Sequence, residues 1–221
     1  MITGTILRQV APRTPNPDTV AGLINRICPQ YGIRNADILH EFLANLLEEC
    51  GEFNTFAESL NYSVTSLRRV FGVHRISDAD AARLCRTATR PADQVALANI
   101  LYGGQFGRKN LGNTQPNDGW NFRGSGPIHL TGRRNMEAFT AFFNANQGTR
   151  HTAEQMAHLL RTDLAIGMHS ACWIFAVSKK LIQAAIDDQF ETTVRRINGG
   201  LTNFPKRKQY YNALVRLLPV R

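Results

Sequence analysis

The segment from Asp37 to Glu49 constrains the fold most, because it joins a strong helical pattern to two adjacent acids. Its apolar residues recur at helical spacing and predict one buried face, formed by Ile38, Phe42, Leu43, Leu46 and Leu47. Gly51 ends the pattern, so Glu48 and Glu49 fall on the last turn of the helix. Carboxylates in that position oppose the helix dipole. The placement has no obvious structural benefit, which suggests a chemical role for one of them.

Another acid, Glu58, follows beyond the bend at Gly51. Two carboxylates on either side of a helix break can face each other across a groove. Glycoside hydrolysis needs such a pair, one acid to protonate the leaving oxygen and one base to activate water. The alternative is that these glutamates lie in solvent, as most helical glutamates do. The stretch by itself leaves both interpretations open.

The rest of the chain predicts a mostly helical protein with long glycine-rich loops. Asp18 is a candidate N-cap for a helix over 19–30, while Ser77 and Pro91 are expected to start two more. Apolar periodicity predicts further helices at 133–146, 152–160, 163–177, 179–187, 190–197 and 205–218. Residues 127–131 are expected to form a short strand or extended segment. At 221 residues, the chain is long enough for one domain, with room for two lobes.

The segment from Tyr102 to Gly126 is long, irregular and rich in Gly, Asn and Asp. A loop of this length in a compact domain is usually functional or disordered. Its aromatic residues, Phe106, Trp120 and Phe122, indicate that it is ordered. Glycine lets the backbone approach a ligand closely, and aromatic faces suit sugar rings. The composition fits a carbohydrate cleft, but it also fits a phosphate or nucleic-acid loop.

Composition and charge narrow the classes of function. The formal net charge is +9, which favours anionic partners such as nucleic acid, membrane surfaces or a bacterial envelope. No apolar run approaches the 18 or so residues that span a bilayer. The N-terminus lacks the apolar region of a Sec signal, so we expect none.

Several other catalytic or metal-binding arrangements are disfavoured. The four cysteines are scattered without a CxxC pair, so we expect buried thiols and no zinc site. His40-Glu41 is followed by Asn45 where the zincin motif requires a second histidine. His129 is isolated and no Ser-His-Asp arrangement is visible. Cys50 lies near the acids, but a nucleophilic thiol would need a histidine partner that we cannot identify.

Four motifs, taken together, resemble the glycoside hydrolase family 19 domain. They are FLANLLEECGEF, ESLNYS, YGGQFGRKNLGNTQPNDGWNFRGSGPIHLTGRRN and RRINGG, with Arg207, Tyr210 and Tyr211 after the last. They occur in the family's order over residues of about 42–211, and SACWIF at 170–175 also fits. The resemblance is to the branch that contains bacteriophage endolysins and bacterial chitinase-like proteins. It favours the catalytic interpretation of the opening acids.

The resemblance implies a fold and a set of site residues. The fold is mainly α, a lysozyme-like, two-lobed helical architecture with a substrate cleft, and residues 1–221 form a single catalytic domain without a separate cell-wall-binding domain. Glu49 matches the general acid, Glu58 the general base and Thr131 the residue that positions water, while Arg207 tunes the site electrostatically. The substrate-binding positions are Asn61, Tyr62, Trp120, His129, Asn135 and Asn198. Neither a metal nor a cofactor is implied.

The sequence departs from the family pattern at three informative positions. Glu48 stands where the family has histidine, so it is a possible alternative acid. Consecutive helical residues point about 100° apart, and the register favours Glu49. Ser125 replaces an arginine and His129 a glutamine. Contacts with substrate are therefore expected to differ from those of typical relatives.

The function that the resemblance implies is degradation of peptidoglycan by an inverting acid/base mechanism. We expect a muramidase (lysozyme-type) endolysin that cleaves β-1,4 bonds between N-acetylated sugars. The alternatives are a chitinase acting on chitin oligomers, a secreted antibacterial cell-wall hydrolase and a non-catalytic glycan-binding protein. The expected partners are peptidoglycan, or a chitin-like polysaccharide, and the anionic envelope, without nucleic acid. We expect a monomer made in the cytoplasm that reaches the wall by holin-type or secretion-system release.

Overall fold

The computed structural model describes residues 1–219. These residues form two compact units. Among the described residues, the first unit contains 1–56, 126–128 and 160–219, and the second contains 57–125 and 129–159. Both are built from helices, and the only β pairing in the described part consists of two isolated bridges, Ala57 with Ser125 and Ser125 with Leu130. The mainly helical fold class is therefore as predicted. That the chain forms a single catalytic domain stays a prediction.

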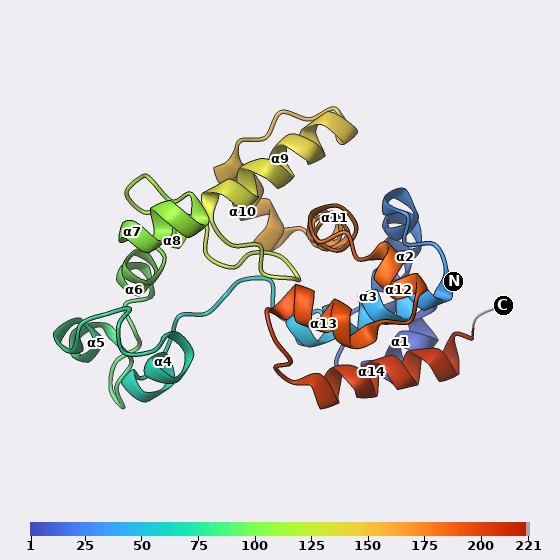
Figure 1. Cartoon of the computed structure of the whole chain (residues 1–221), viewed down its shortest axis with the longest axis horizontal. Coiled ribbons are helices and arrows are strands. Elements are labelled where there is room, and N and C mark those ends of the chain that lie inside the picture. The colour runs from blue at the N-terminus through green and yellow to red at the C-terminus, as the bar shows by residue number, and fades with distance from the viewer. Residues whose placement is uncertain (220–221) are drawn as a thin grey trace. The chain divides into compact units, whose positions relative to one another are not determined.

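The first unit is organised around α3 (Ala36–Glu49), which other helices surround (Figure 1). These are α1 (Gly4–Val10), α2 (Pro17–Ile27), α11 (Leu164–Trp173), α12 (Ile182–Ile186), α13 (Phe190–Asn198) and α14 (Phe204–Leu217). Every residue of α3 from Ile38 to Leu47 is buried. The sequence predicted one buried face, but neighbours on all sides cover the polar residues as well.

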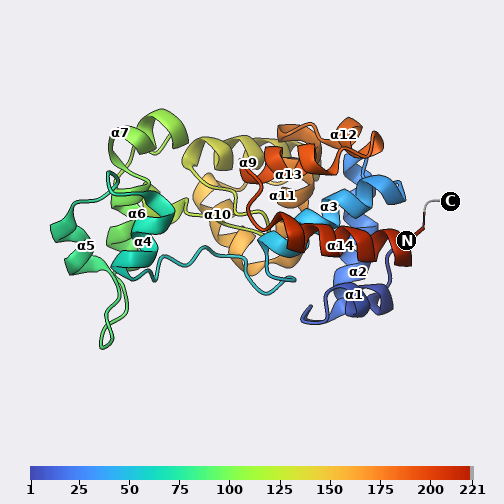
Figure 2. The same cartoon turned by 60° about the horizontal axis from the view of Figure 1, so that its bottom comes forward.

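Helix α14 runs alongside α3, as Figure 2 shows. The two helices pack through many residues, and this pairing brings positions about 160 apart in the sequence together. A 3₁₀ turn (Cys28–Tyr31) extends α2, and a π-helical turn (Ile174–Ser178) extends α11. The predicted helix over 163–177 therefore has about the right residue range. It is not α-helical throughout, because its last part is a π-helical turn.

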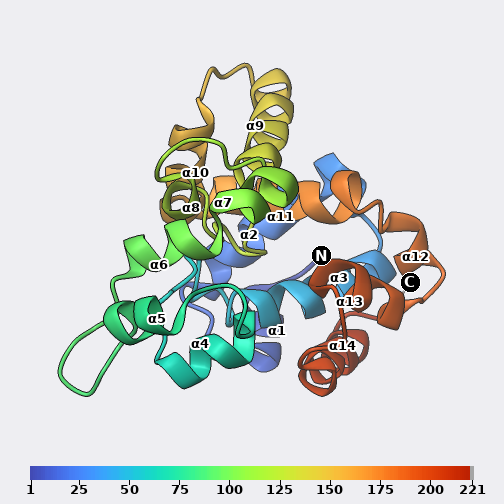
Figure 3. The ribbon, with the colours of Figure 1, turned by 60° about the vertical axis from the view of Figure 1, so that its left-hand side comes forward.

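The second unit has a hydrophobic core of its own. Helices α4 (Val64–Phe71), α5 (Asp78–Leu84) and α6 (Gln94–Leu101) lie together in Figure 3. The remaining helices of this unit are α7 (Gly104–Phe106), α8 (Asp118–Asn121), α9 (Arg133–Gln147) and most of α10 (Ala153–Thr162). The core contains Leu60, Leu67, Leu84, Leu97 and Leu101, all at most 2 % exposed.

Capping residues set several helix starts, and two differ from the prediction. Ser63 and Ser77 each accept a hydrogen bond from a backbone N–H in the first turn, as expected for N-caps. The predicted start at Pro91 is wrong, because Asp93 caps a helix that begins at Gln94. The predicted cap at Asp18 is also wrong: Asn16 is the N-cap of α2, and Asp18 lies in its first turn.

Two loop predictions were incomplete. The segment 102–126 is ordered as expected, but it contains α7, a π-helical turn (Gly107–Leu111) and α8 rather than irregular chain throughout. Residues 127–131 form a tight turn closed by the Ser125–Leu130 bridge, not a strand. Within residues 1–219, no helix is both long and apolar enough to cross a membrane.

Candidate active site

Glu49 lies at the end of α3 against a buried cation. Arg207 of α14 donates from Nη2 to Glu49 Oε1 at 2.5 Å, and its side chain is almost fully buried. Its other donors reach Asn45 Oδ1 at 3.1 Å and the Thr202 carbonyl at 3.2 Å. A carboxylate at a helix C-terminus is unfavourable, and a fixed guanidinium offsets this cost. The predicted pairing of Arg207 with the candidate acid is present in the structure.

The neighbouring acid, Glu48, has different partners. Its Oε2 lies 2.8 Å from Lys206 Nζ, and Asn203 Nδ2 donates to its Oε1 at 2.8 Å. Both carboxylate oxygens of Glu48 therefore contact residues at the start of α14. Adjacent residues of α14, Lys206 and Arg207, supply one cation to each acid. This arrangement separates Glu48 from Glu49 and assigns Glu48 to an ion pair.

A strained turn follows α3 and fixes the chain after the acids. Gly51, Glu52 and Phe53 have φ of 53°, 62° and 65°, a left-handed conformation that is costly for the two residues other than glycine. Arg13 donates three hydrogen bonds to the Glu52 carboxylate, and Tyr210 donates a fourth at 2.9 Å. Burial acts to raise the pKa of Glu52, but these donors together lower it. The network stabilises the turn.

In the second unit, Glu58 accepts two hydrogen bonds from fixed donors. Tyr102 Oη donates to Oε1 at 2.5 Å, and the Gly124 backbone N–H donates to Oε2 at 3.0 Å. Burial, and then the charge of Glu58, raise the pKa of Tyr102, so the phenol keeps its proton. A Cβ on Gly124 would lie 3.1 Å from Glu58 Cβ and 3.0 Å from His129 Cβ, so a larger residue would require these side chains to shift. Both donors stabilise the charge of the Glu58 carboxylate.

Aromatic and cationic side chains surround Glu58 within this unit. Burial, and then the negative charge of Glu58, raise the pKa of Tyr62. Burial lowers the pKa of Arg123, and Glu58 partly opposes that shift. The Arg123 guanidinium lies 3.5 Å from the centre of the Trp120 ring, a cation–π contact. Three predicted site residues, Glu58, Tyr62 and Trp120, therefore belong to one neighbourhood that includes Arg123.

The turn before α9 places three further predicted residues in a chain of hydrogen bonds. Thr131 Oγ1 donates to the His129 carbonyl at 2.8 Å, and Asn135 Nδ2 donates to the Thr131 carbonyl at 2.8 Å. His129 has a left-handed φ of 44°, and its buried Nε2 has no hydrogen-bond partner among the described residues. Because the Thr131 hydroxyl gives its proton to a carbonyl, its oxygen is oriented to accept one.

Two predicted substrate-binding asparagines lie apart from these contacts. Asn61 Oδ1 accepts from the Ala92 N–H at 3.0 Å, which ties two loops of the second unit together. Asn198 ends α13 in the first unit, and Gly199 follows it as the helix C-cap with φ of 74°. The buried Nδ2 of Asn198 has no partner among residues 1–219.

Sequence reasoning missed three contributors: Tyr102, Arg13 and Asn45. Tyr102 was visible only as the first letter of a motif, and its contact with Glu58 spans 44 positions. Arg13 gave no signal, because nothing local connects it with Glu52. In the sequence, Asn45 served only to exclude a zincin motif. In the structure, its Oδ1 accepts a hydrogen bond from Arg207. Among the described residues, no group of His, Cys, Asp and Glu side chains is arranged to hold a metal ion.

The chain has similar proteins among both sequences and solved structures. No protein-family model matches the chain. A glycosyl hydrolase family 19 domain-containing protein of Haemophilus influenzae is 30% identical over 202 residues, which cover 90% of each chain. Chitinase C from Streptomyces griseus has a similar structure, with a TM-score of 0.60 and 16% identity over 99% of this chain and 77% of that one. A bacterial family 19 chitinase gives a TM-score of 0.61 and 16% identity over 100% and 96%.

Proposed function

The chain belongs to glycosyl hydrolase family 19 and is a glycoside hydrolase, and we propose that it degrades peptidoglycan with Glu49 as acid and Glu58 as base. The observation that carries the assignment is the contrast between the two carboxylates. Glu49 accepts a hydrogen bond from the Arg207 guanidinium, while Glu58 accepts hydrogen bonds from the Tyr102 hydroxyl and the Gly124 N–H. The two carboxylates thus have different partners, a guanidinium for Glu49 and neutral donors for Glu58, and each stands in one of the two acid-bearing motifs.

The proposed reaction is an inverting displacement. Glu49 in its protonated form donates to the glycosidic oxygen as the bond from that oxygen to the anomeric carbon breaks. Glu58 takes a proton from a water molecule whose oxygen attacks the same carbon from the opposite face. After transfer, Arg207 stabilises the Glu49 carboxylate that has formed. The Thr131 oxygen, oriented as an acceptor, suits the second hydrogen of the water.

Donors in the motif segments support recognition of a sugar. Arg123 Nε and Asn198 Nδ2 are buried and without partners among residues 1–219. Buried donors of this kind are normally satisfied, and sugar hydroxyl or acetamido oxygens are suitable acceptors. The Trp120 ring provides the apolar face on which sugar rings commonly pack. Asn61, Tyr62, His129 and Asn135 complete the proposed substrate-binding set.

Peptidoglycan is favoured over chitin by charge. Peptidoglycan and its envelope carry carboxylates and phosphates, whereas chitin is neutral, and the chain carries a formal charge of +9. An endolysin released through a holin lesion, or a secreted antibacterial effector, fits this substrate. The second candidate is a chitinase, which the names of the similar structures favour.

Product analysis on two substrates tests the proposal. Purified peptidoglycan and N-acetylglucosamine oligomers are digested in parallel, and mass spectrometry identifies the new ends. Muramic acid at the reducing end supports the muramidase assignment. Glucosamine ends, or anhydro-muramic ends, would replace it with a glucosaminidase or a lytic transglycosylase. Cleavage of the oligomers alone would favour the chitinase, and binding without any product would indicate a glycan-binding protein.

Variants test the residues. We expect Glu49→Gln and Glu58→Gln each to lower activity by about 10²–10⁴-fold, the range for loss of general acid or base catalysis. Glu48→Gln is the matched control, because it changes the adjacent carboxyl and leaves the Arg207 contact intact. If Glu48→Gln were the inactive variant and Glu49→Gln retained activity, the assignment of the acid would be wrong.

A further inference from the structure

Two of the four cysteines lie close together in the first unit. Cys28, in the 3₁₀ turn after α2, and Cys172, in α11, have their sulfur atoms 3.7 Å apart, although 144 positions separate them in the sequence. Both side chains are at most 1 % exposed, and both are free thiols. The other two thiols have no such neighbour: Cys50 donates to the Leu46 carbonyl, and Cys85 belongs to the core of the second unit.

The position of this thiol pair in the chain is unusual. The first unit is built mainly from two long segments, 1–56 and 160–219, and the residues of the second unit fall between them in the sequence. Cys28 belongs to the earlier segment and Cys172 to the later one. A covalent bond here would join the two parts of the first unit directly. It would also close a loop of 144 positions, which removes much conformational freedom from the unfolded chain.

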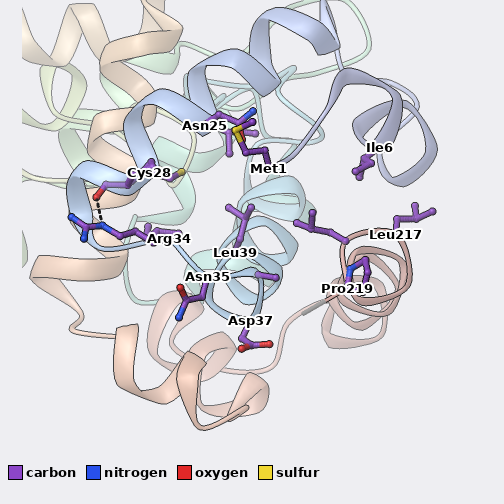
Figure 4. A pocket seen from close by; sticks show the side chains of 15 residues that line it. Met1, Ile6, Asn25, Cys28, Arg34, Asn35, Asp37, Leu39, Leu217 and Pro219 are labelled. Carbon is purple, nitrogen blue, oxygen red and sulfur yellow. Dashed lines mark hydrogen bonds between the residues drawn. The ribbon is translucent and has the colours of Figure 1, made fainter. Parts of the chain in front are cut away.

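Cys28 lines a cavity, and Cys172 does not. Cys28 is among the residues that line a cavity of about 900 Å³ beside α2 and α14, shown in Figure 4. Cys172 is not among them. Burial, and then the neighbouring Cys28 thiol, raise the pKa of Cys172 well above the ordinary value for a thiol. Exchange with a dissolved disulfide is therefore expected to begin at Cys28.

We propose that Cys28 and Cys172 form an intramolecular disulfide when the protein meets a disulfide oxidant. The Cys28 thiolate attacks one sulfur of the oxidant, whose other sulfur leaves as a thiolate and takes up the proton. Cys172 then loses its proton and attacks Cys28 Sγ, which displaces the second oxidant thiol. The pair loses two electrons and two protons, and the oxidant is reduced to two thiols. The Cys28 and Cys172 sulfur atoms must close from 3.7 Å to about 2.0 Å.

The disulfide has a measurable consequence for stability. A cross-link that closes a long loop stabilises a folded protein chiefly by restricting the unfolded state. We expect the oxidised protein to melt at roughly 5–10 °C above the reduced protein. The gain would matter in an oxidising compartment such as the periplasm, where the proposed wall substrate lies. The cross-link itself does not depend on the proposed function.

The experiment oxidises the protein in two ways. Folded protein, and protein refolded from denaturant, are each incubated with a mixture of oxidised and reduced glutathione, and the remaining thiols are alkylated. Peptide mass spectrometry without reduction then maps the bonds. The double variant Cys50→Ser/Cys85→Ser keeps only the proposed pair and serves as the positive control, and Cys172→Ser removes the second thiol.

The folded and the refolded samples are compared by their cross-links and by their Tm. We expect a Cys28–Cys172 cross-link in the wild type and in Cys50→Ser/Cys85→Ser, and a glutathione adduct on Cys28 in Cys172→Ser. The higher Tm should disappear when a reductant is added. Free thiols at both positions in the refolded protein would overturn the proposal. Cross-links of Cys28 or Cys172 with the other cysteines at comparable yield would overturn it as well.

Discussion

Glu41, in the middle of α3, gives a prediction whose magnitude follows from the structure. Its side chain is 0 % exposed, and neither carboxylate oxygen has a hydrogen-bond partner among residues 1–219. Burial raises its pKa from 4.5 to about 7, and the charges of Asp188 and Asp37 add to the shift. The folded protein therefore holds a proton on Glu41 over a pH range in which the unfolded chain has released it.

The sign and size of the effect follow from linkage. Between pH 4.5 and 7 the folded state binds one more proton at Glu41 than the unfolded state, so the free energy of unfolding falls as pH rises. At about 1.4 kcal/mol per unit of pKa, the total loss is about 3 kcal/mol. For a chain of this length, that corresponds to a decrease in Tm of roughly 6–12 °C.

Glu41→Gln tests this directly, because glutamine has nearly the same shape and does not titrate. The free energy of unfolding is measured by urea denaturation at pH 5 and pH 8 for the wild type, Glu41→Gln and the exposed control Glu191→Gln. We expect Glu41→Gln to gain about 3 kcal/mol relative to the wild type between the two pH values. The control should follow the wild type. If Glu41→Gln loses as much stability as the wild type over this range, Glu41 is not the buried acid that the structure indicates.

Three further variants test the surroundings of the proposed catalytic pair. Tyr102→Phe removes one charge-assisted hydrogen bond from Glu58, so kcat should fall about 10–100-fold with little change in Tm, and an unchanged kcat would exclude a positioning role. Arg207→Met leaves Glu49 and Asn45 unpaired and should cost about 3–5 kcal/mol of stability by urea unfolding; a loss below 1 kcal/mol would contradict the buried ion pair. Gly124→Ala should push the Glu58 side chain aside and lower kcat more than KM in steady-state assays, and wild-type kinetics would show that the turn adapts.

Local patterns in the sequence predicted most of the fold. Helix periodicity located α3, α9, α13 and α14 to within a few residues, because each buries an apolar face against neighbours. The serine caps at Ser63 and Ser77 also follow from local chemistry. The start of α6 was missed because both Pro91 and Asp93 are plausible residues at a helix start. In the structure, Asp93 is the N-cap, since its Oδ1 accepts a hydrogen bond from the Ala96 N–H.

The resemblance names the candidate acids but not the residues that hold them. Glu49, Glu58 and Arg207 stand in recognisable motifs, so a resemblance could locate them. The separation of Glu48 from Glu49 depends on Asn203 and Lys206, which lie more than 150 positions away. No local sequence pattern predicts contacts between residues so far apart in the chain. Burial on all sides of α3 was likewise invisible, because it arises from helices that are distant in the sequence.

The central claim is that Glu58 activates the attacking water while Glu49 protonates the leaving group. Azide is a small nucleophile that needs no general base, so it can replace that water in Glu58→Ala. NMR of the products formed in sodium azide measures both the rescue and the anomeric configuration. We predict that azide restores cleavage by Glu58→Ala, with an α-glycosyl azide as product, and that it restores none in Glu49→Ala. A β-glycosyl azide, or no rescue of Glu58→Ala, would contradict the proposed mechanism.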